Sequence, residues 1–450
     1  MHMHCHSRIA QLALLACLAF STPLHAESDD GTPKVNFSGF GTLGFAHTQG
    51  NGAAFERDMS QPKGATNRGL FWELDSRIGV QATMSFTDNL EGAAQFLSRY
   101  RAENNFQPEL TLGYLKYSAN DYITLRAGRV GYDIFHAADS RDVGFSYLWI
   151  RPPLEYYGAD ATPYIDGGDI SLHTPIGSGV GRIKLYSGLV REQIPNLIAQ
   201  KQWAGNITAD LGIMQDLSGT RITGGLIDYQ GNNWVFRLSQ SQMRILKEIP
   251  AGPIDTLGFI RNTAVAQTDP ILAGSLNKLA DDLSFASKTI TLSSAGLIYE
   301  DGPLRTEGAI YHLKSTSLMF GELYAGYLSA GYRIGKITPY ATIAAIKSKK
   351  SYRAEELNGK GVDAAASIAQ FMLTRAEQAR HAYALGMRYD LKTNVALKFQ
   401  VDLIRNNTCS PVALPLTATA PCSPPLLLPT VPVPWDGKAT VYSTVVDFTF

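Results

Sequence analysis

Beyond its N-terminus the sequence contains no hydrophobic run of about 20 residues, the length that a membrane-spanning helix needs. This absence excludes a bundle of membrane-spanning helices. The chain also has no excess of positive charge, because 40 Lys and Arg are balanced by 40 Asp and Glu, which argues against nucleic acid as the main partner. Charged residues make up only 18% of the 450 residues, whereas 41 Gly, 21 Tyr and 19 Phe are present. This composition favours a strand-rich protein.

Histidine and cysteine are too few and too scattered to indicate a catalytic or metal site. Four of the nine His fall within the first 26 residues. The other five, at positions 47, 136, 173, 312 and 381, show no Ser-His spacing and no metal-ligand cluster. We therefore expect no enzyme activity, no metal and no cofactor.

Residues 1–26 have the features of a secretory signal peptide. Arg8 supplies the positive charge, and Ile9 to Phe20 form an apolar stretch that is too short to span a membrane. Cleavage is expected after Ala26, which leaves residues 27–450 as one domain. Of the four cysteines only Cys409 and Cys422 remain, on either side of a Pro-rich stretch. In an exported protein they favour a disulfide, with two free thiols as the alternative.

The segment from Glu73 to Phe86 indicates a long strand. Apolar residues such as Leu74, Ile78 and Val80 alternate with polar ones over fourteen residues. Strands of soluble proteins usually run for about five or six residues. The greater length predicts a tilted membrane-spanning strand.

Short turns alternate along the chain with much longer loops. Turns such as 87–89, 118–121, 231–233 and 335–336 separate alternating segments, and the long loops between them include 131–163. Alternation of this kind is typical of an outer-membrane β-barrel, with short periplasmic turns and long outer loops. Sixteen strands are expected, at about 35–48, 70–86, 90–102, 108–118, 122–130, 164–174, 181–190, 220–230, 234–245, 287–300, 304–315, 322–334, 338–349, 381–390, 395–405 and 438–450. An error of one hairpin would give 14 or 18.

Two of the long loops contain helical patterns. Val362 to Gln378 is rich in Ala, and Pro270 to Leu283 places leucines at helical spacing. Short helices over the mouth of the barrel are expected there.

Several segments resemble Gram-negative outer-membrane porins. Residues 123–157 are similar to the fifth strand and third loop of these proteins, residues 326–340 to one of their hairpins, and the final strand with its terminal Phe450 to their C-terminal strand. The third loop differs from the short acidic loop of the best-known general porins, because it contains Trp149-Ile150-Arg151-Pro152-Pro153. The resemblance implies an all-β transmembrane barrel in the outer membrane whose third loop folds into the pore. It also implies a homotrimer that contacts outer-membrane lipid and lipopolysaccharide, and recognition by the barrel assembly machinery through Phe450.

Charges of both signs are expected at the narrowest part of such a pore. The candidate constriction residues are Arg77, Arg99, Arg101 and Arg126 on the wall and Asp133, Asp139, Arg141, Asp142, Arg151 and Glu155 in the third loop. Acidic groups opposed by arginines would create a transverse field that orders water and disfavours apolar solutes.

The expected function is passive diffusion of small hydrophilic solutes and ions through a water-filled channel. A channel specific for sugars, phosphate or organic acids is an alternative, because the third loop contains Tyr147, Trp149, Tyr156 and Tyr157. A lipid hydrolase is a second alternative. It would need a lipid-facing Ser-His pair, whereas His173 and His312 are expected to face the lumen.

Overall fold

The computed structural model describes most of the chain after residue 33. The described residues are 34–49, 54–58, 60, 61, 63–101, 103–136, 138, 140–158, 162–195, 214–249, 255–349, 357, 359–376, 378–406, 427, 428 and 437–450. The expected signal peptide and the Cys409/Cys422 pair lie outside them.

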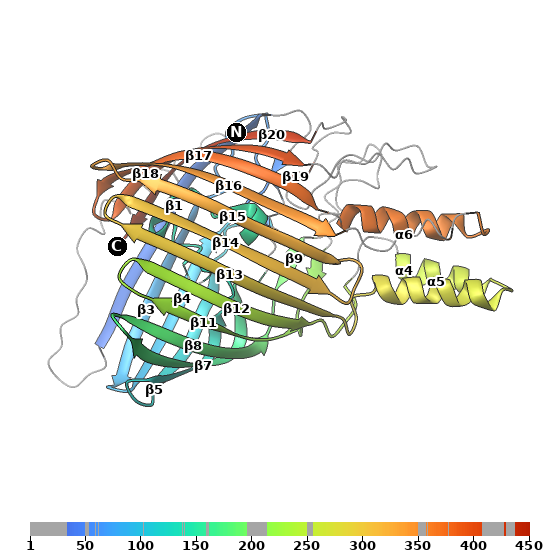
Figure 1. The fold of residues 1–450 in the computed structure, drawn as a ribbon, viewed down its shortest axis with the longest axis horizontal. Helices are drawn as coiled ribbons and strands as arrows, with labels where there is room; N and C mark the ends of the chain where they lie inside the picture. The colour runs from blue at the N-terminus through green and yellow to red at the C-terminus, as the bar shows by residue number, and fades with distance from the viewer. Residues whose placement is uncertain are drawn as a thin grey trace, which may run out of the picture.

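Sixteen antiparallel strands form one closed barrel, which confirms the predicted count and fold class (Figure 1). The strands are β1 Lys34–Gln49, β3 Arg77–Thr87, β4 Leu90–Arg99, β5 Glu109–Ser118, β6 Ile123–Gly131, β7 Tyr164–Ile176, β8 Gly179–Leu189, β11 Arg221–Gln230, β12 Trp234–Arg244, β13 Thr289–Asp301, β14 Leu304–Ser315, β15 Glu322–Tyr332, β16 Ile337–Lys349, β17 Ala379–Lys392, β18 Val395–Asn406 and β20 Lys438–Thr449. Closure pairs the backbone of every barrel strand on both sides and leaves no free edge.

Strict alternation of side chains gives the barrel two different faces. In β16 the inward-facing Thr338, Tyr340 and Thr342 are buried, whereas the outward-facing Ile343 is 52% exposed. Leu385 of β17 is likewise 63% exposed on the outside. An outer surface of exposed aliphatic side chains is what a lipid-facing wall requires. Separately, none of the described helices is long and apolar enough to cross a membrane.

The first and last strands close the barrel through a glycine-aromatic contact. Gly39 and Phe450 exchange two backbone hydrogen bonds, of 2.8 and 2.9 Å. The ring of Phe450 lies against Gly39, where a Cβ atom would come within 2.2 Å of it, and the ring of Phe448 covers Gly41 in the same way. A larger side chain at either glycine would therefore force the terminal aromatic ring to move away from the backbone of β1.

The long loops lie at one end of the barrel and carry the remaining elements. Figure 1 shows the helices projecting from this end, opposite the short turns. They are α4 Thr256–Val265, α5 Pro270–Leu283 and α6 Asp363–Ala376, and two small sheets pair β2 Ala54–Phe55 with β19 Leu427–Leu428 and β9 Gln193–Pro195 with β10 Met214–Asp216. The helices expected over 270–283 and 362–378 are confirmed, whereas α4 was not predicted.

The largest error in a strand boundary is at the second expected strand. The strand expected over 70–86 begins only at Arg77, because residues 72–76 form a turn. Within it the Ser76 hydroxyl donates to the Trp72 carbonyl oxygen at 2.6 Å.

Candidate functional site: a loop fastened across the lumen

The described part of the third loop, residues 132–136, 138, 140–158, 162 and 163, folds into the barrel as predicted. It contains the 3₁₀ turn η1 Gly144–Ser146 and the short helix α2 Leu154–Tyr157. Phe135, Trp149, Ile150 and Tyr156 are at most 2% exposed. Side chains of this size can be so deeply buried in a hollow barrel only when the loop packs against the inner wall.

Aromatic side chains hold one side of the loop to strands β13–β16. The Trp149 indole N–H lies 3.0 Å from both the Ser329 and the Thr342 hydroxyl oxygens. The ring of Tyr156 packs against Tyr311 and Tyr327, with ring centroids 5.4 and 5.2 Å away. Each such aromatic pair contributes about 0.5–1.5 kcal/mol beyond the area that it buries.

A buried lysine on β18 fastens the centre of the loop. The Lys398 ammonium is fully buried and donates to the carbonyl oxygens of Gly144, Tyr147 and Trp149, at 2.7, 2.6 and 2.8 Å. Since these bonds use all three of its protons, the carboxylate of Asp447, at 2.9 Å, balances the charge without a well-aligned hydrogen bond. The lysine therefore joins the loop backbone to the wall at three points.

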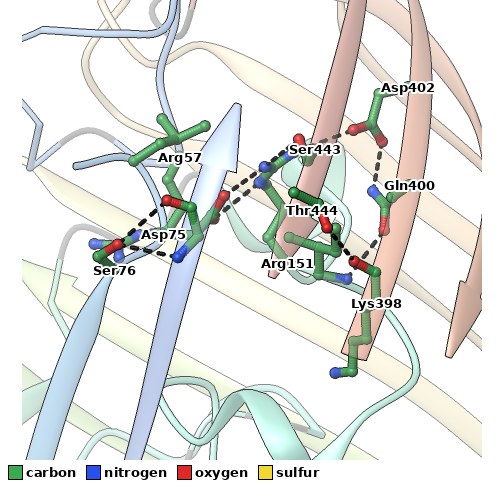
Figure 2. Close-up of polar contacts among 12 residues, drawn as sticks. Arg57, Asp75, Ser76, Arg151, Lys398, Gln400, Asp402, Ser443 and Thr444 are labelled. Atoms are coloured by element: carbon green, nitrogen blue, oxygen red, sulfur yellow. Dashed lines mark hydrogen bonds and ion pairs between the residues drawn. The ribbon is translucent and has the colours of Figure 1, made fainter. Parts of the chain in front are cut away.

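Arg151 fastens the following part of the loop by bridging two carboxylates (Figure 2). Its guanidinium donates to both oxygens of Asp75, at 3.1 and 2.6 Å, and to Asp402 at 3.1 Å. A fourth bond reaches the Ser443 hydroxyl at 2.8 Å. Arg151 is 3% exposed and Asp75 is fully buried.

Glu155 is also used to hold the loop. Its carboxylate pairs with the guanidinium of Arg380 on β17 at 2.7 Å, and both side chains are almost fully buried. Arg151 and Glu155, two of the expected constriction residues, thus contact the wall of β17, β18 and β20 and not open space.

The opposite edge of the loop faces the arginines of β3 and β4. Arg99 donates to the Asp142 carboxylate at 3.3 Å, and the Nε of Arg77 donates to the Asp142 carbonyl oxygen at 2.6 Å. Arg77 also donates to the Tyr147 hydroxyl at 2.8 Å. The structure therefore brings together three of the expected residues, Arg77, Arg99 and Asp142.

The first loop adds a second acid and a further arginine to this edge. The Asp58 carboxylate lies 2.9 Å from Arg57 and 3.8 Å from Arg99. Burial opposes ionisation of Asp142, but the guanidinium of Arg99, followed by those of Arg141, Arg77 and Arg57, holds the pKa of this carboxyl below its usual value. Both acids therefore carry a negative charge at neutral pH, beside four arginines.

Asp133, at the start of the loop, belongs to a second charged group on β8, β11 and β12. Its carboxylate contacts Arg237 at 2.5 Å, Lys184 at 3.3 Å and Arg182 at 3.5 Å. Burial opposes its ionisation, but Arg237, Lys184 and Arg182 lower its pKa. The Asp228 carboxylate bridges Arg182 and Arg237, at 2.6 and 2.8 Å.

The remaining expected residues have other neighbours. Arg126 binds Asp169 with two hydrogen bonds from Nε and one from a terminal nitrogen, and lies over the ring of Tyr114. Arg101 pairs with Glu109 and with Glu103, so it is placed at the second loop and not opposite the third. Asp139 lies outside the described residues.

Open space inside the barrel can be located from side-chain exposure. An inward-facing side chain of a closed barrel can be exposed only to the internal space. Arg126 and Arg182 on the wall are 19% and 25% exposed, and Asp142 and Asp58 on the loops are 18% and 20% exposed. This open space, which we call the internal passage, therefore lies between residues 140–142 of the third loop and the wall from β3 to β8.

One expectation about histidine was wrong. His173 faces the lumen as expected, but His312 of β14 faces outward, directly opposite Ser293 on β13. The reason is that polarity is reversed in this part of the wall, where Tyr311 and Leu313 point inward and are buried at 2% and 7% exposure. No hydrogen bond joins the two side chains. The imidazole Nε2 lies 3.0 Å from Glu322, and the Ser293 hydroxyl accepts a hydrogen bond from Gln240 at 3.3 Å.

Comparisons with known proteins identify the fold. No family model and no curated protein matches the sequence. Among solved structures, the outer membrane channel DcaP of Acinetobacter baumannii matches with a TM-score of 0.52 at 10% identity, over 95% of this chain and 100% of that chain. Salmonella typhi OmpF, in a complex with daunomycin, matches with a TM-score of 0.50 at 10% identity over 94% and 100%. OmpT of Vibrio cholerae matches with a TM-score of 0.50 at 12% identity over 95% and 100%. The chain thus has the closed sixteen-stranded fold of Gram-negative outer-membrane porins and channels.

Proposed function

We propose that the protein is an outer-membrane channel through which small hydrophilic solutes and ions diffuse passively. The observation that carries this proposal is the internal passage, where partly exposed charges of both signs line the edge of the third loop and the facing wall. Fixed charges on both sides of a narrow aqueous gap favour hydrated polar solutes over apolar ones. Buried contacts hold the third loop against the wall. They keep the aqueous gap between the loop edge and the facing wall permanently narrow, as expected of a passive pore.

The aromatic residues of the third loop give no support to a substrate-specific channel. Tyr147, Trp149, Tyr156 and Tyr157 are all at most 7% exposed. They pack against the wall and each other, so they do not present stacking surfaces to a passing solute.

The proposed function is tested with the purified protein in planar bilayers. We expect stable ohmic conductance steps that grow in proportion to bulk salt concentration, and uptake of small neutral sugars into proteoliposomes at rates that fall with solute size. Saturation of the current by one solute at low concentration would show instead a specific binding site in the channel. Absence of any conductance from a folded barrel would exclude the channel function.

We propose further that three copies associate in the membrane, as the resemblance to porins implies. The expected result is a species of three times the monomer mass in mild detergent that converts to a monomer on heating. Light scattering in several detergents measures this directly, and a monomer in all of them would contradict the proposal.

We propose that the barrel is not a lipid hydrolase, although Ser293 and His312 lie opposite each other on its outer face. A serine nucleophile is activated by a hydrogen-bonded base, and no such bond joins these side chains. We expect no phospholipid hydrolysis above background in mixed micelles, and no change for Ser293→Ala or His312→Ala. Hydrolysis that both substitutions abolish would restore the enzyme alternative.

A further inference from the structure

The first loop, which connects β1 to β3, enters the barrel beside the third loop. Among its described residues, Phe55, Gln61 and Ala65 are at most 2% exposed. Phe55 packs in one buried cluster with inward-facing side chains of β1, β18 and β20, among them Ile404 of β18. Its backbone exchanges two hydrogen bonds with Ala65, of 2.8 and 2.7 Å, which close the loop into a compact lobe. The first loop is therefore part of the barrel interior.

A buried glutamine fixes the turn that carries Asp58. The Gln61 side chain accepts a hydrogen bond from the Arg57 backbone N–H at 2.7 Å and donates one to the Leu74 carbonyl oxygen at 2.9 Å. The Asp58 carboxylate accepts a hydrogen bond from the Ser60 backbone N–H at 2.9 Å. These bonds tie the turn to the segment that leads into β3, so the carboxylate of Asp58 has a defined position beside the wall.

The first and third loops meet at two places. The Arg151 guanidinium of the third loop lies over the Phe55 ring, 5.0 Å from its centroid. At the second place, Nη1 of Arg99 lies 3.8 Å from the Asp58 carboxylate and 3.3 Å from that of Asp142. Because both distances end on the same nitrogen, these carboxylate oxygens are closer together than the screening length of about 8 Å in 0.15 M salt. The two charges therefore act together on a passing ion.

These two carboxylates face the internal passage, whereas neighbouring arginines lie behind them. The side chains of Asp58 and Asp142 are 20% and 18% exposed. Arg57, Arg77 and Arg99 are at most 7% exposed. An ion in the passage thus comes closer to the acidic groups than to these three guanidinium groups. Acidic side chains that line a pore favour cations, and each of the two loops supplies one of them.

We propose that the first loop determines ion selectivity together with the third, and that Asp58 and Asp142 form one site for permeating cations. This inference rests on the proposed channel function. The ligands of the site are small hydrated cations and the ammonium groups of small solutes. If Asp58 served only to hold Arg57 in place, its charge would not reach a permeating ion.

The test measures the reversal potential of the intact protein in a salt gradient across a planar bilayer. Asp58→Asn should shift it towards anions and change the permeability ratio by about two- to fourfold, as expected for Asp142→Asn, because each substitution removes one charge beside the same passage. The double variant should change the ratio by about the product of the two single changes.

The matched control is Asp166→Asn. The Asp166 side chain is 24% exposed, close to the value for Asp58, and it also pairs with arginines, Arg129 at 2.7 Å and Arg191 at 2.9 Å. It faces the outside of the barrel on β7, however, whereas Asp169 of the same strand faces inward. The control should leave the permeability ratio unchanged.

A second arm separates the charge of Asp58 from its part in the structure of the loop. Asp58→Cys is modified with thiosulfonate reagents of opposite charge, and the modification is confirmed by mass. A negatively charged adduct should restore the preference for cations, whereas a positively charged adduct should shift the reversal potential further towards anions. The unsubstituted protein, treated in the same way, gives the background from Cys409 and Cys422.

The possible failures of this proposal can be told apart. A barrel that conducts and responds to Asp142→Asn but not to Asp58→Asn would overturn the role of the first loop and leave the channel function intact. Equal shifts for Asp58→Asn and Asp166→Asn, or the same shift with both adducts, would also overturn it. A folded barrel without conductance would contradict the channel function itself.

Discussion

Replacing Lys398 by methionine is expected to free the third loop, destabilise the barrel and raise the single-channel conductance. The substitution removes three hydrogen bonds to the loop backbone and leaves the Asp447 carboxylate without its nearest cation. Breaking a buried ion pair from one side typically costs about 3–5 kcal/mol. We expect a fall of this size in the free energy of unfolding, measured by urea denaturation, together with larger and noisier conductance steps.

The matched control for this experiment is Lys116→Met. Lys116 is another inward-facing lysine, but its side chain is 36% exposed and lies 3.9 Å from Glu91 on the neighbouring strand β4. A partly exposed pair of this kind contributes at most about 1 kcal/mol, so both stability and conductance should stay close to those of the unmodified protein. If Lys398→Met barrels fold but conduct like the control, Lys398 does not hold the loop in place.

The strands and their order could be predicted because each strand is indicated by the residues of its own segment. Apolar and polar residues alternate along such a segment, or exposed and buried ones, as from Ile337 to Lys349. This alternation indicates a strand with lipid on one side. The rule that polar residues face the lumen failed at His312. There the lumen is filled by the loop, so apolar side chains such as Tyr311 point inward and polar ones outward. A polarity rule for a hollow barrel does not apply where a loop replaces the water.

The fastening of the loop could not be predicted, because it depends on contacts between distant segments. Lys398 is a single lysine in a strand, and nothing near it indicates that carbonyl oxygens about 250 residues away will surround it. The third-loop residues Asp142, Arg151 and Glu155 were recognised as charged and near the pore. Their sequence does not reveal that Asp142 meets the arginine wall while the other two are buried on the opposite side. Arg57 and Asp58 were missed because the first loop was not expected to enter the lumen.

The charges at the narrow passage are expected to set ion selectivity. In a salt gradient across a planar bilayer, Arg99→Ala should shift the reversal potential towards cations, because the carboxylates of Asp142 and Asp58 then face one positive charge fewer. Asp142→Asn should shift it towards anions. One charge about 10 Å from a permeating ion changes its energy by about 0.4 kcal/mol even in bulk water, which is roughly a twofold change in local concentration. Since cations and anions respond oppositely, the permeability ratio should change by about two- to fourfold.

The pH dependence and a matched variant make this prediction more specific. Since neighbouring guanidinium groups hold the pKa of Asp142 below its usual value, this carboxyl stays ionised as the pH falls to about 5, and the effect of Asp142→Asn should be the same at pH 5 and pH 8. Arg101→Ala is the control for Arg99→Ala, because Arg101 pairs with Glu103 and Glu109 at the second loop. In 0.15 M salt, screening over about 8 Å limits its influence on the passage. Equal shifts for Arg99→Ala and Arg101→Ala, or no shift for both Arg99→Ala and Asp142→Asn, would place the selective region of the pore elsewhere.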